Sequence, residues 1–178
     1  ELRTPLNAII GFSELLMAAP APTEKQEYMR IIRSNGEVLM QQLSDILDLS
    51  KIEAGTLGYE YTDVELNAVM EELEGGFRMQ QPKNSPVRIT FHRKYPVRYI
   101  RTDRKRLIQV IANFLSNAVK FTDEGGHVTL RATFDAPSTS VVFAVSDDGI
   151  GMSEEFKERI FEPFTMEGRS REQGTGLG

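Results

Sequence analysis

Three polar residues, Asn113, Asn117 and Lys120, are spaced so that a helix would place them on one face. Asparagine inside a helix is less favourable than alanine, because its side chain competes for backbone hydrogen bonds. Two asparagines one turn apart therefore suggest a function. An amide carbonyl oxygen can ligate Mg²⁺, which prefers hard oxygen donors, and a lysine one turn later can meet a phosphate. An ordinary polar helix surface is the alternative that this helix alone leaves open.

A second group of candidate residues follows an apolar segment and has the pattern Asp-x-Gly-x-Gly, at Asp147, Gly149 and Gly151. Glycines at these positions allow a sharp turn and a close approach of the backbone to a flat ligand. The carboxylate can accept a hydrogen bond from an exocyclic amine such as that of adenine. Plain turns use the same residue types. Residues 174–178 form a further glycine cluster whose amides could hold phosphates, although it matches neither a P-loop nor a dinucleotide fingerprint.

The elements that carry these residues follow from hydrophobic periodicity. Helices are expected at residues 63–79, 104–121 and 154–160. Strands are expected at residues 87–92, 128–134 and 140–146, and the last of these is apolar enough to be covered on both sides. Helices beside a mostly antiparallel sheet form an α+β two-layer sandwich.

The first fifty-odd residues predict a helical hairpin. Apolar residues recur at helical spacing over residues 2–17, and the Ala-Pro-Ala-Pro run at 19–22 ends that helix. Thr23 and Gln26 predict a capping box that opens a second helix over about residues 23–53. Two such wide apolar stripes cannot cover each other, so we expect a homodimeric four-helix bundle through residues 1–54. Packing of the hairpin onto its own chain is the alternative.

Composition limits the function classes. The chain has 178 residues, 40% hydrophobic and 26% charged, which fits a soluble globular protein. It has no cysteine, which excludes disulfides and cysteine nucleophiles, and its two histidines argue against a multi-histidine metal centre. No apolar run approaches the ~20 residues of a membrane span. Residues 83–106 carry nine basic residues and one acidic residue, but their alternation with apolar residues favours a solvated sheet face over nucleic-acid binding.

Taken in order, the motifs resemble those of sensor histidine kinases of two-component systems. Residues 1–13 resemble the phosphoacceptor box, and residues 50–55, Ser-Lys-Ile-Glu-Ala-Gly, are also typical of the end of the family's hairpin. Residues 113–122 resemble the asparagine box, and residues 147–151 resemble the first glycine box. Residues 160–164 resemble the phenylalanine box, and residues 174–178 resemble the second glycine box. The related ATPases of gyrase, mismatch-repair and heat-shock chaperone type share the nucleotide boxes, but they lack the Glu-Leu-Arg-Thr-Pro hairpin.

The resemblance implies two domains and two cofactors, ATP and Mg²⁺. Residues 1–56 would be the dimerisation and histidine-phosphotransfer hairpin, and residues 57–178 the catalytic ATP-binding domain, truncated at its second glycine box. Asn113 would bind Mg²⁺, Asn117 would lie near the triphosphate and Lys120 would contact phosphate. Asp147 would accept the adenine amine. The other nucleotide-binding residues implied are Phe121, Gly149, Gly151, Gly174, Thr175, Gly176, Leu177 and Gly178, and residues 164–174 would form a mobile lid.

The reaction implied is transfer of the γ-phosphoryl group to a histidine of the hairpin, for relay to an aspartate of a response-regulator receiver domain. In the family this histidine directly precedes the residue equivalent to Glu1. Glu1 would orient the imidazole and accept its proton, and Thr4 would position water during dephosphorylation of the partner. His92 and His127 fall on the polar side of strands, so the 178-residue chain is expected to bind ATP without phosphorylating itself.

Two points stay open at this level. A kinase-like scaffold, acting mainly as a response-regulator phosphatase or docking module, is the alternative function. The protein is expected in the cytoplasm with no membrane contact within these residues, and anchoring of a parent protein in the bacterial inner membrane is the alternative location.

Overall fold

The computed structural model describes residues 2–18, 21–80, 87–92, 99–135, 139–162 and 165. These residues divide into two compact units. The first contains residues 2–57, with which residues 158–162 and 165 group, and the second contains residues 58–157. None of the helices in the described part is long and apolar enough to cross a membrane.

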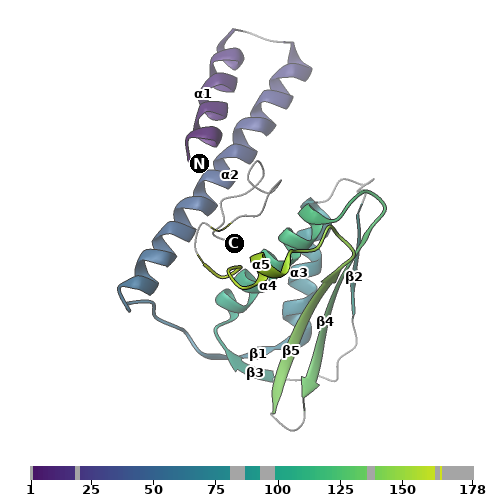
Figure 1. The fold of residues 1–178 in the computed structure, drawn as a ribbon. Coiled ribbons are helices and arrows are strands. Elements are labelled where there is room, and N and C mark those ends of the chain that lie inside the picture. Colours follow the sequence, from purple (N-terminus) through teal and green to yellow (C-terminus); the bar gives the residue numbers. More distant parts are fainter. Residues whose placement is uncertain are drawn as a thin grey trace. The chain divides into compact units, whose positions relative to one another are not determined.

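The first unit is a helical hairpin of α1 (Arg3–Met17) and α2 (Pro22–Glu53), which pack side by side (Figure 1). The rings of Phe12 and Tyr28 join the two helices near the turn, with centroids 5.6 Å apart. Proline is favoured at the first helical position because the amide that it lacks would have no helical partner there, and α2 begins at Pro22. The Glu24 carboxylate accepts a hydrogen bond from the backbone N–H of Ala21 at 3.0 Å. The predicted capping box at Thr23 and Gln26 is therefore wrong.

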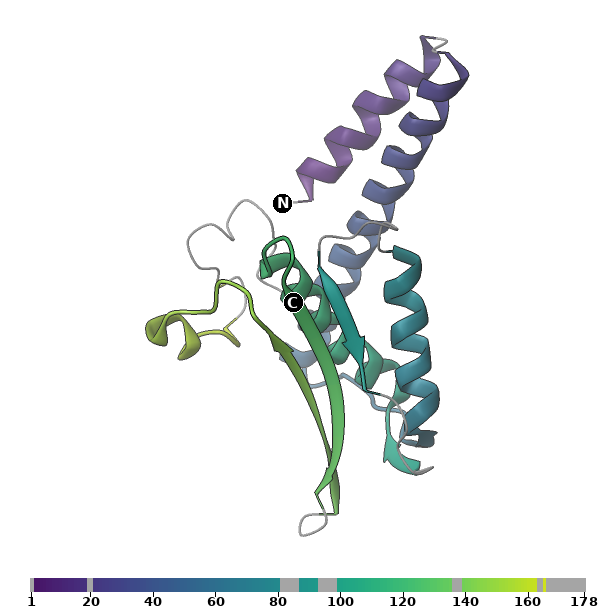
Figure 2. The same ribbon diagram turned by 90° about the vertical axis from the view of Figure 1, so that its right-hand side faces the viewer.

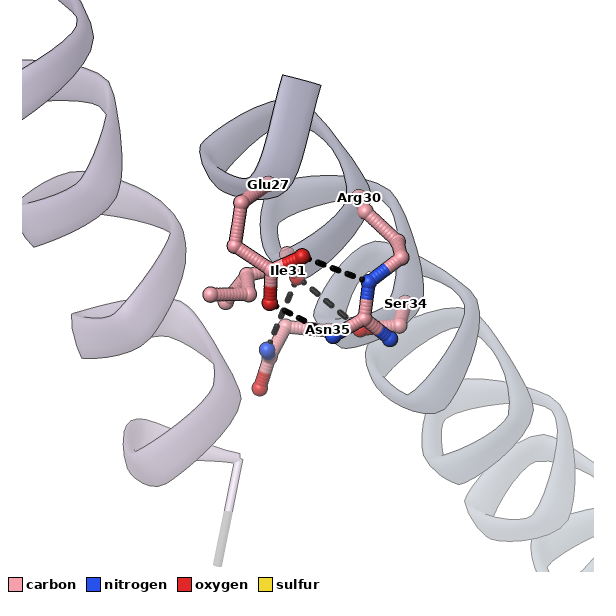
Figure 3. A network of polar contacts seen from close by, with 5 residues as sticks. All are labelled: Glu27, Arg30, Ile31, Ser34 and Asn35. Atoms are coloured by element: carbon pink, nitrogen blue, oxygen red, sulfur yellow. Dashed lines mark hydrogen bonds and ion pairs between the residues drawn. The ribbon is translucent and has the colours of Figure 1, made fainter. Parts of the chain in front are cut away.

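The middle of α2 contains Ser34 and Asn35, residue types that weaken an isolated helix. Figure 3 shows that both side chains donate to the carbonyl oxygen of Ile31, at 3.0 and 2.9 Å. One turn earlier, the Arg30 guanidinium donates to both carboxylate oxygens of Glu27, at 2.6 and 3.1 Å. The polar side chains find partners within the helix itself, and α2 continues unbroken over 32 residues.

The second unit contains a three-stranded sheet and a two-stranded sheet. In the larger sheet β4 (His127–Asp135) lies in the middle, parallel to β2 (Arg88–Phe91) and antiparallel to β5 (Ser140–Asp147). The smaller sheet pairs β1 (Thr62–Glu65) with β3 (Tyr99–Thr102). Helices α3 (Leu66–Gln80) and α4 (Arg104–Phe121) lie on one face of the larger sheet (Figures 1 and 2). This arrangement confirms the α+β two-layer sandwich, and two of the three strand pairs among the described residues are antiparallel, as predicted.

The core of the second unit lies between the larger sheet and these two helices. Its most deeply buried side chains are Val69 of α3, Leu115 of α4, and Val128 and Leu130 of β4. Each such side chain contributes about 1.5–3 kcal/mol relative to an exposed one. Leu115 lies near the middle of α4, so its burial holds this face of the helix against the sheet. The helix faces on either side of Leu115 are not needed for the core.

Three further details differ from the sequence prediction. Residues 62–65 form β1 rather than the first turn of a helix over 63–79, because Val64 pairs with Ile100 of β3 and is buried. The helix predicted at 154–160 is regular only in α5 (Glu154–Lys157). Val142 of β5 is 51% exposed, so within the described residues β5 is not covered on both faces.

Candidate functional site

The helix that carries the candidate asparagines is fixed at its N-terminus by one carboxylate. Asp103 is the N-cap of α4, and its Oδ1 accepts from the backbone N–H of Arg106 at 3.0 Å. Its Oδ2 accepts from the backbone N–H of Glu60 at 3.0 Å. The Glu60 amide, followed by the Arg106 amide, holds the pKa of Asp103 below its ordinary value. The start of α4 is thereby tied to the segment that precedes β1.

Asn113, Asn117 and Lys120 lie on a partly buried face of α4, as the sequence predicts. Among the residues that the structure describes, neither asparagine side chain has a hydrogen-bond partner. Phe114, between them, is 47% exposed. The ammonium of Lys120 lies 4.7 Å from the centroid of the Phe121 ring, within the range of a cation–π contact. This face offers two amide groups and one positive charge in sequence along the helix.

Asp147 ends β5 and lies on the side of the sheet that faces the helices. Its partner in the β4–β5 register is Val128, which is fully buried, and paired residues point to the same face. The Oδ1 atom of Asp147 accepts from the backbone N–H of Gly149 at 3.1 Å. Its Oδ2 atom has no hydrogen-bond partner in the described part of the chain. One carboxylate oxygen therefore shapes the loop and the other is available to a ligand.

The loop after Asp147 packs directly on the C-terminal end of α4. The backbone N–H of Ile150 donates to the carbonyl oxygen of Phe121 at 3.1 Å. A Cβ atom added at Gly149 would lie 2.3 Å from the same oxygen, so only glycine fits there. Gly151 has φ +66°, a backbone conformation that favours glycine. The two glycines of the motif thus have separate geometric reasons, close approach and positive φ.

A neighbouring carboxylate, that of Asp148, has a role that the sequence analysis missed. Its Oδ1 accepts from the backbone N–H of His127 at 2.7 Å, and its Oδ2 lies 3.5 Å from Nδ1 of the same histidine. The His127 amide is the main cause that holds the pKa of Asp148 below its ordinary value. A Cβ at Gly126 would lie 2.6 Å from Oδ1. The sequence signal for this contact was the glycine pair before His127, because a segment that approaches the backbone this closely leaves no room for a side chain.

The remaining predicted residues are placed as follows. Thr4 is exposed in the first turn of α1, and both His92 and His127 are exposed, as expected. Phe161 is 84% exposed. The other predicted site residues lie outside the described residues, namely Glu1, Gly174, Thr175, Gly176, Leu177 and Gly178, together with most of the expected lid. The structure thus brings the Asp147 loop to the end of α4, and it leaves the second glycine box untested.

Comparison with known protein families gives two matches along the chain. Residues 1–55 match the His Kinase A (phospho-acceptor) domain. Residues 102–178 match the family described as histidine kinase-, DNA gyrase B-, and HSP90-like ATPase. The first match covers the hairpin, and the second covers α4, β4, β5 and the Asp147 loop.

The cell-division control histidine kinase PdhS of Brucella canis is 37% identical over 195 aligned positions, which cover 100% of this chain and 18% of that protein. The chain therefore spans less than a fifth of the length of the curated relatives it matches. The structure of ShkA in complex with AMPPNP is similar over 98% of this chain and 36% of that one, with 27% identity and a TM-score of 0.70.

The complex of histidine kinase ThkA with response regulator protein TrrA shares the fold, with 24% identity and a TM-score of 0.62 over 93% of this chain and 48% of that one. Two family matches in this order, an alignment of the whole chain to part of a named histidine kinase and the shared fold agree with one another. The chain belongs to the sensor histidine kinase family, with a phosphoacceptor hairpin followed by an ATPase domain.

Proposed function

We propose that this chain is the catalytic core of a protein-histidine kinase, which binds Mg-ATP and transfers the γ-phosphoryl group to a histidine of the hairpin for relay to an aspartate of a response regulator. The observation that carries the proposal is the Asp147 loop, held against the Phe121 carbonyl with one carboxylate oxygen left available. The names of the relatives support it, since PdhS is a histidine kinase, ShkA was solved with AMPPNP and ThkA with a response regulator.

In this proposal the residues of α4 and of the loop divide the work. Oδ2 of Asp147 accepts a hydrogen bond from the exocyclic amine of adenine. Gly149 and Gly151 have no side chains, so they let the backbone lie close to the adenine ring. Asn113 supplies an amide oxygen for the metal, with Asn117 one turn further along the helix, and Lys120 supplies a positive charge for a phosphate. Mg²⁺, when bound, neutralises charge on the phosphates. The amides of Asn113 and Asn117 fit this use because no described residue occupies them.

Other parts of the proposal rest on the family alone. The domain boundary is placed between residues 56 and 57, Glu1 orients the phosphoacceptor imidazole and accepts its proton, and Thr4 positions water for dephosphorylation of the response regulator. The nucleotide-binding set also includes Phe121 and the second glycine box, Gly174, Thr175, Gly176, Leu177 and Gly178.

Asn113→Ala tests the metal assignment. Because the substitution removes the proposed amide ligand, the gain in ATP affinity that Mg²⁺ provides should fall roughly tenfold, the cost of a lost contact to a charged group. Isothermal titration calorimetry with and without Mg²⁺ measures this gain. Ser116→Ala, at an exposed position of α4, is the matched control and should keep the wild-type dependence. An unchanged Mg²⁺ dependence in Asn113→Ala contradicts the assignment.

We also propose that the hairpin pairs with a second copy of itself. Packing of α1 on α2 leaves many large apolar side chains exposed, including Leu6, Ile10, Leu15, Met29, Val38, Met40, Leu43, Leu47 and Ile52. A surface of this extent on two helices is covered in four-helix bundles by two further helices. The apolar surface therefore supports a homodimer through residues 1–54.

Leu47→Glu tests the dimer. Leu47 is 60% exposed, and a glutamate in its place would put a charge from each copy into the bundle, at a cost that should weaken association on the order of a hundredfold. Light scattering after gel filtration should give twice the 20.1 kDa chain mass for the wild type and one chain mass for Leu47→Glu. Arg30→Glu, at an exposed position of α2 whose neighbours one turn away are all polar, should remain dimeric. A monomeric wild type would refute the proposal.

A further inference from the structure

A row of three polar residues crosses the larger sheet at the end where the Asp147 loop begins. Arg88 of β2 is the partner of His127 of β4 in the parallel register, and Asp148 comes directly after the last pair of β4 and β5, Val128 with Asp147. Because side chains alternate along strands and Val128 faces the core, the row lies on the opposite, outer face. The side chains of His127 and Asp148 are 56% and 55% exposed. His127 therefore directly precedes Val128 and Asp148 directly follows Asp147, but both lie on the opposite face of the sheet from these two residues.

Both oxygens of the Asp148 carboxylate face His127. Oδ1 accepts from the backbone N–H of His127 at 2.7 Å, and Oδ2 lies 3.5 Å from its Nδ1. The backbone N–H of Asp148 donates in return to the carbonyl oxygen of His127 at 3.3 Å. Oδ1 also sits over Gly126, where a Cβ would approach it to 2.6 Å. These contacts tie the loop after β5 to the turn before β4, one residue before Gly149 packs on the end of α4.

We propose that Asp148 is a positioning residue for the nucleotide loop and acts through His127, whose protonation strengthens the tie, so that nucleotide affinity rises as the pH falls. The proposal rests on the proposed nucleotide site, because Asp147 is the residue whose placement matters. A protonated imidazole always has a donor at Nδ1 for the Asp148 carboxylate, whereas a neutral one has it in only one tautomer. Histidine changes its charge between about pH 5 and pH 8, and the tie is weaker at the upper end of that range.

Charged side chains on three neighbouring segments accompany His127 in sequence or in strand register. Asp148 stays ionised throughout, because the His127 amide holds the pKa of the carboxyl below its ordinary value. The turn before His127 adds two acidic side chains, Asp123 and Glu124, and the neighbouring strand β2 adds one basic side chain, Arg88.

The pH dependence of ADP affinity tests the proposal. Isothermal titration calorimetry of the 178-residue chain at about pH 5.5 and about pH 8 compares the wild type with His127→Gln. The ADP phosphates change protonation equally in both measurements, so the difference between the two proteins reports on His127. On lowering the pH, the wild type should gain roughly threefold more affinity than His127→Gln, as expected for a partly exposed ion pair. Asp148→Asn keeps an oxygen for the His127 amide but loses the charge, so it should lack this gain as well.

His92→Gln is the matched control, since His92 is the other histidine, is exposed and follows β2 in the same sheet. It should keep the wild-type pH dependence. Equal pH dependence in the wild type and His127→Gln overturns the proposal. Failure of the wild type to bind ADP at either pH refutes the proposed nucleotide site instead. In that case amide hydrogen exchange at Ile150 without nucleotide decides whether His127 holds the loop: exchange at about pH 5.5 should be faster in His127→Gln, and equal rates refute the tie.

Discussion

Asp147→Asn should lower the affinity for ATP and ADP on the order of a hundredfold. The variant loses a charge-assisted hydrogen bond to adenine and places one hydrogen-bond donor opposite another. The N–H of Gly149 holds Oδ1 of Asp147 at 3.1 Å, so in the variant the amide oxygen would stay at that position. The amide NH₂ group would then occupy the place of Oδ2 and face the exocyclic amine of adenine. Titration with ADP measures the loss.

The control for this variant is Asp63→Asn, which removes a carboxylate from an exposed position of β1. Its ADP affinity should match that of the wild type. Circular dichroism should show that both variants keep the wild-type secondary structure, because neither position belongs to the apolar core. Wild-type ADP affinity in Asp147→Asn would remove the carboxylate from the site.

Gly149→Ala should lose nucleotide affinity to a similar extent and should also destabilise the second unit, by about 2 kcal/mol or more. The added Cβ would lie 2.3 Å from the Phe121 carbonyl oxygen and 2.9 Å from Oδ1 of Asp147. The Phe121 carbonyl oxygen belongs to the backbone of α4 and cannot turn aside, so the loop must move away from α4 and give up the hydrogen bond from Ile150 to Phe121. Thermal unfolding and ADP titration measure the two effects.

Gly151→Ala separates close approach from backbone strain. Gly151 has φ +66°, but a Cβ there would have no atom within 4 Å, so alanine should cost only about 1–2 kcal/mol of strain. We therefore expect a smaller loss of affinity than in Gly149→Ala. If Gly149→Ala unfolds at the wild-type temperature and binds ADP normally, the loop does not pack on Phe121 in the way described.

Much of the fold followed from local sequence signals. The helix over residues 104–121 was predicted at its observed bounds, because its apolar stripe is long and Phe121 is the last residue before the turn. The strand pair β1 and β3 was missed, because four residues each are too few for a period to stand out from the adjoining helices. The start of α2 was misplaced by one residue, because Pro22 was assigned to the helix break and it is in fact the first helical residue.

The candidate site was predicted in its residue types and not in its contacts. The pattern Asp-x-Gly-x-Gly indicated a turn near a ligand, but it could not say that Gly149 must avoid the carbonyl of Phe121. That contact joins residues 28 positions apart, and it exists only because α4 and β5 pack in one core. The same holds for His127, which the sequence indicated only as an exposed sheet residue and which proves to be the partner of Asp148.

By itself, the sequence determined the long helices, the strands of the larger sheet, their order and the family, because hydrophobic periodicity and motif spacing are properties of the chain read along its length. The motif spacing had already selected Asp147, but only the tertiary structure showed that the adjacent aspartates Asp147 and Asp148 point to opposite faces of the sheet. The pairing of Val128 with Asp147 turns the first carboxylate toward the helices and the second toward the outer face and His127. Strand register sets that choice, since a shift by one residue would exchange the two faces, and register depends on packing across the whole sheet.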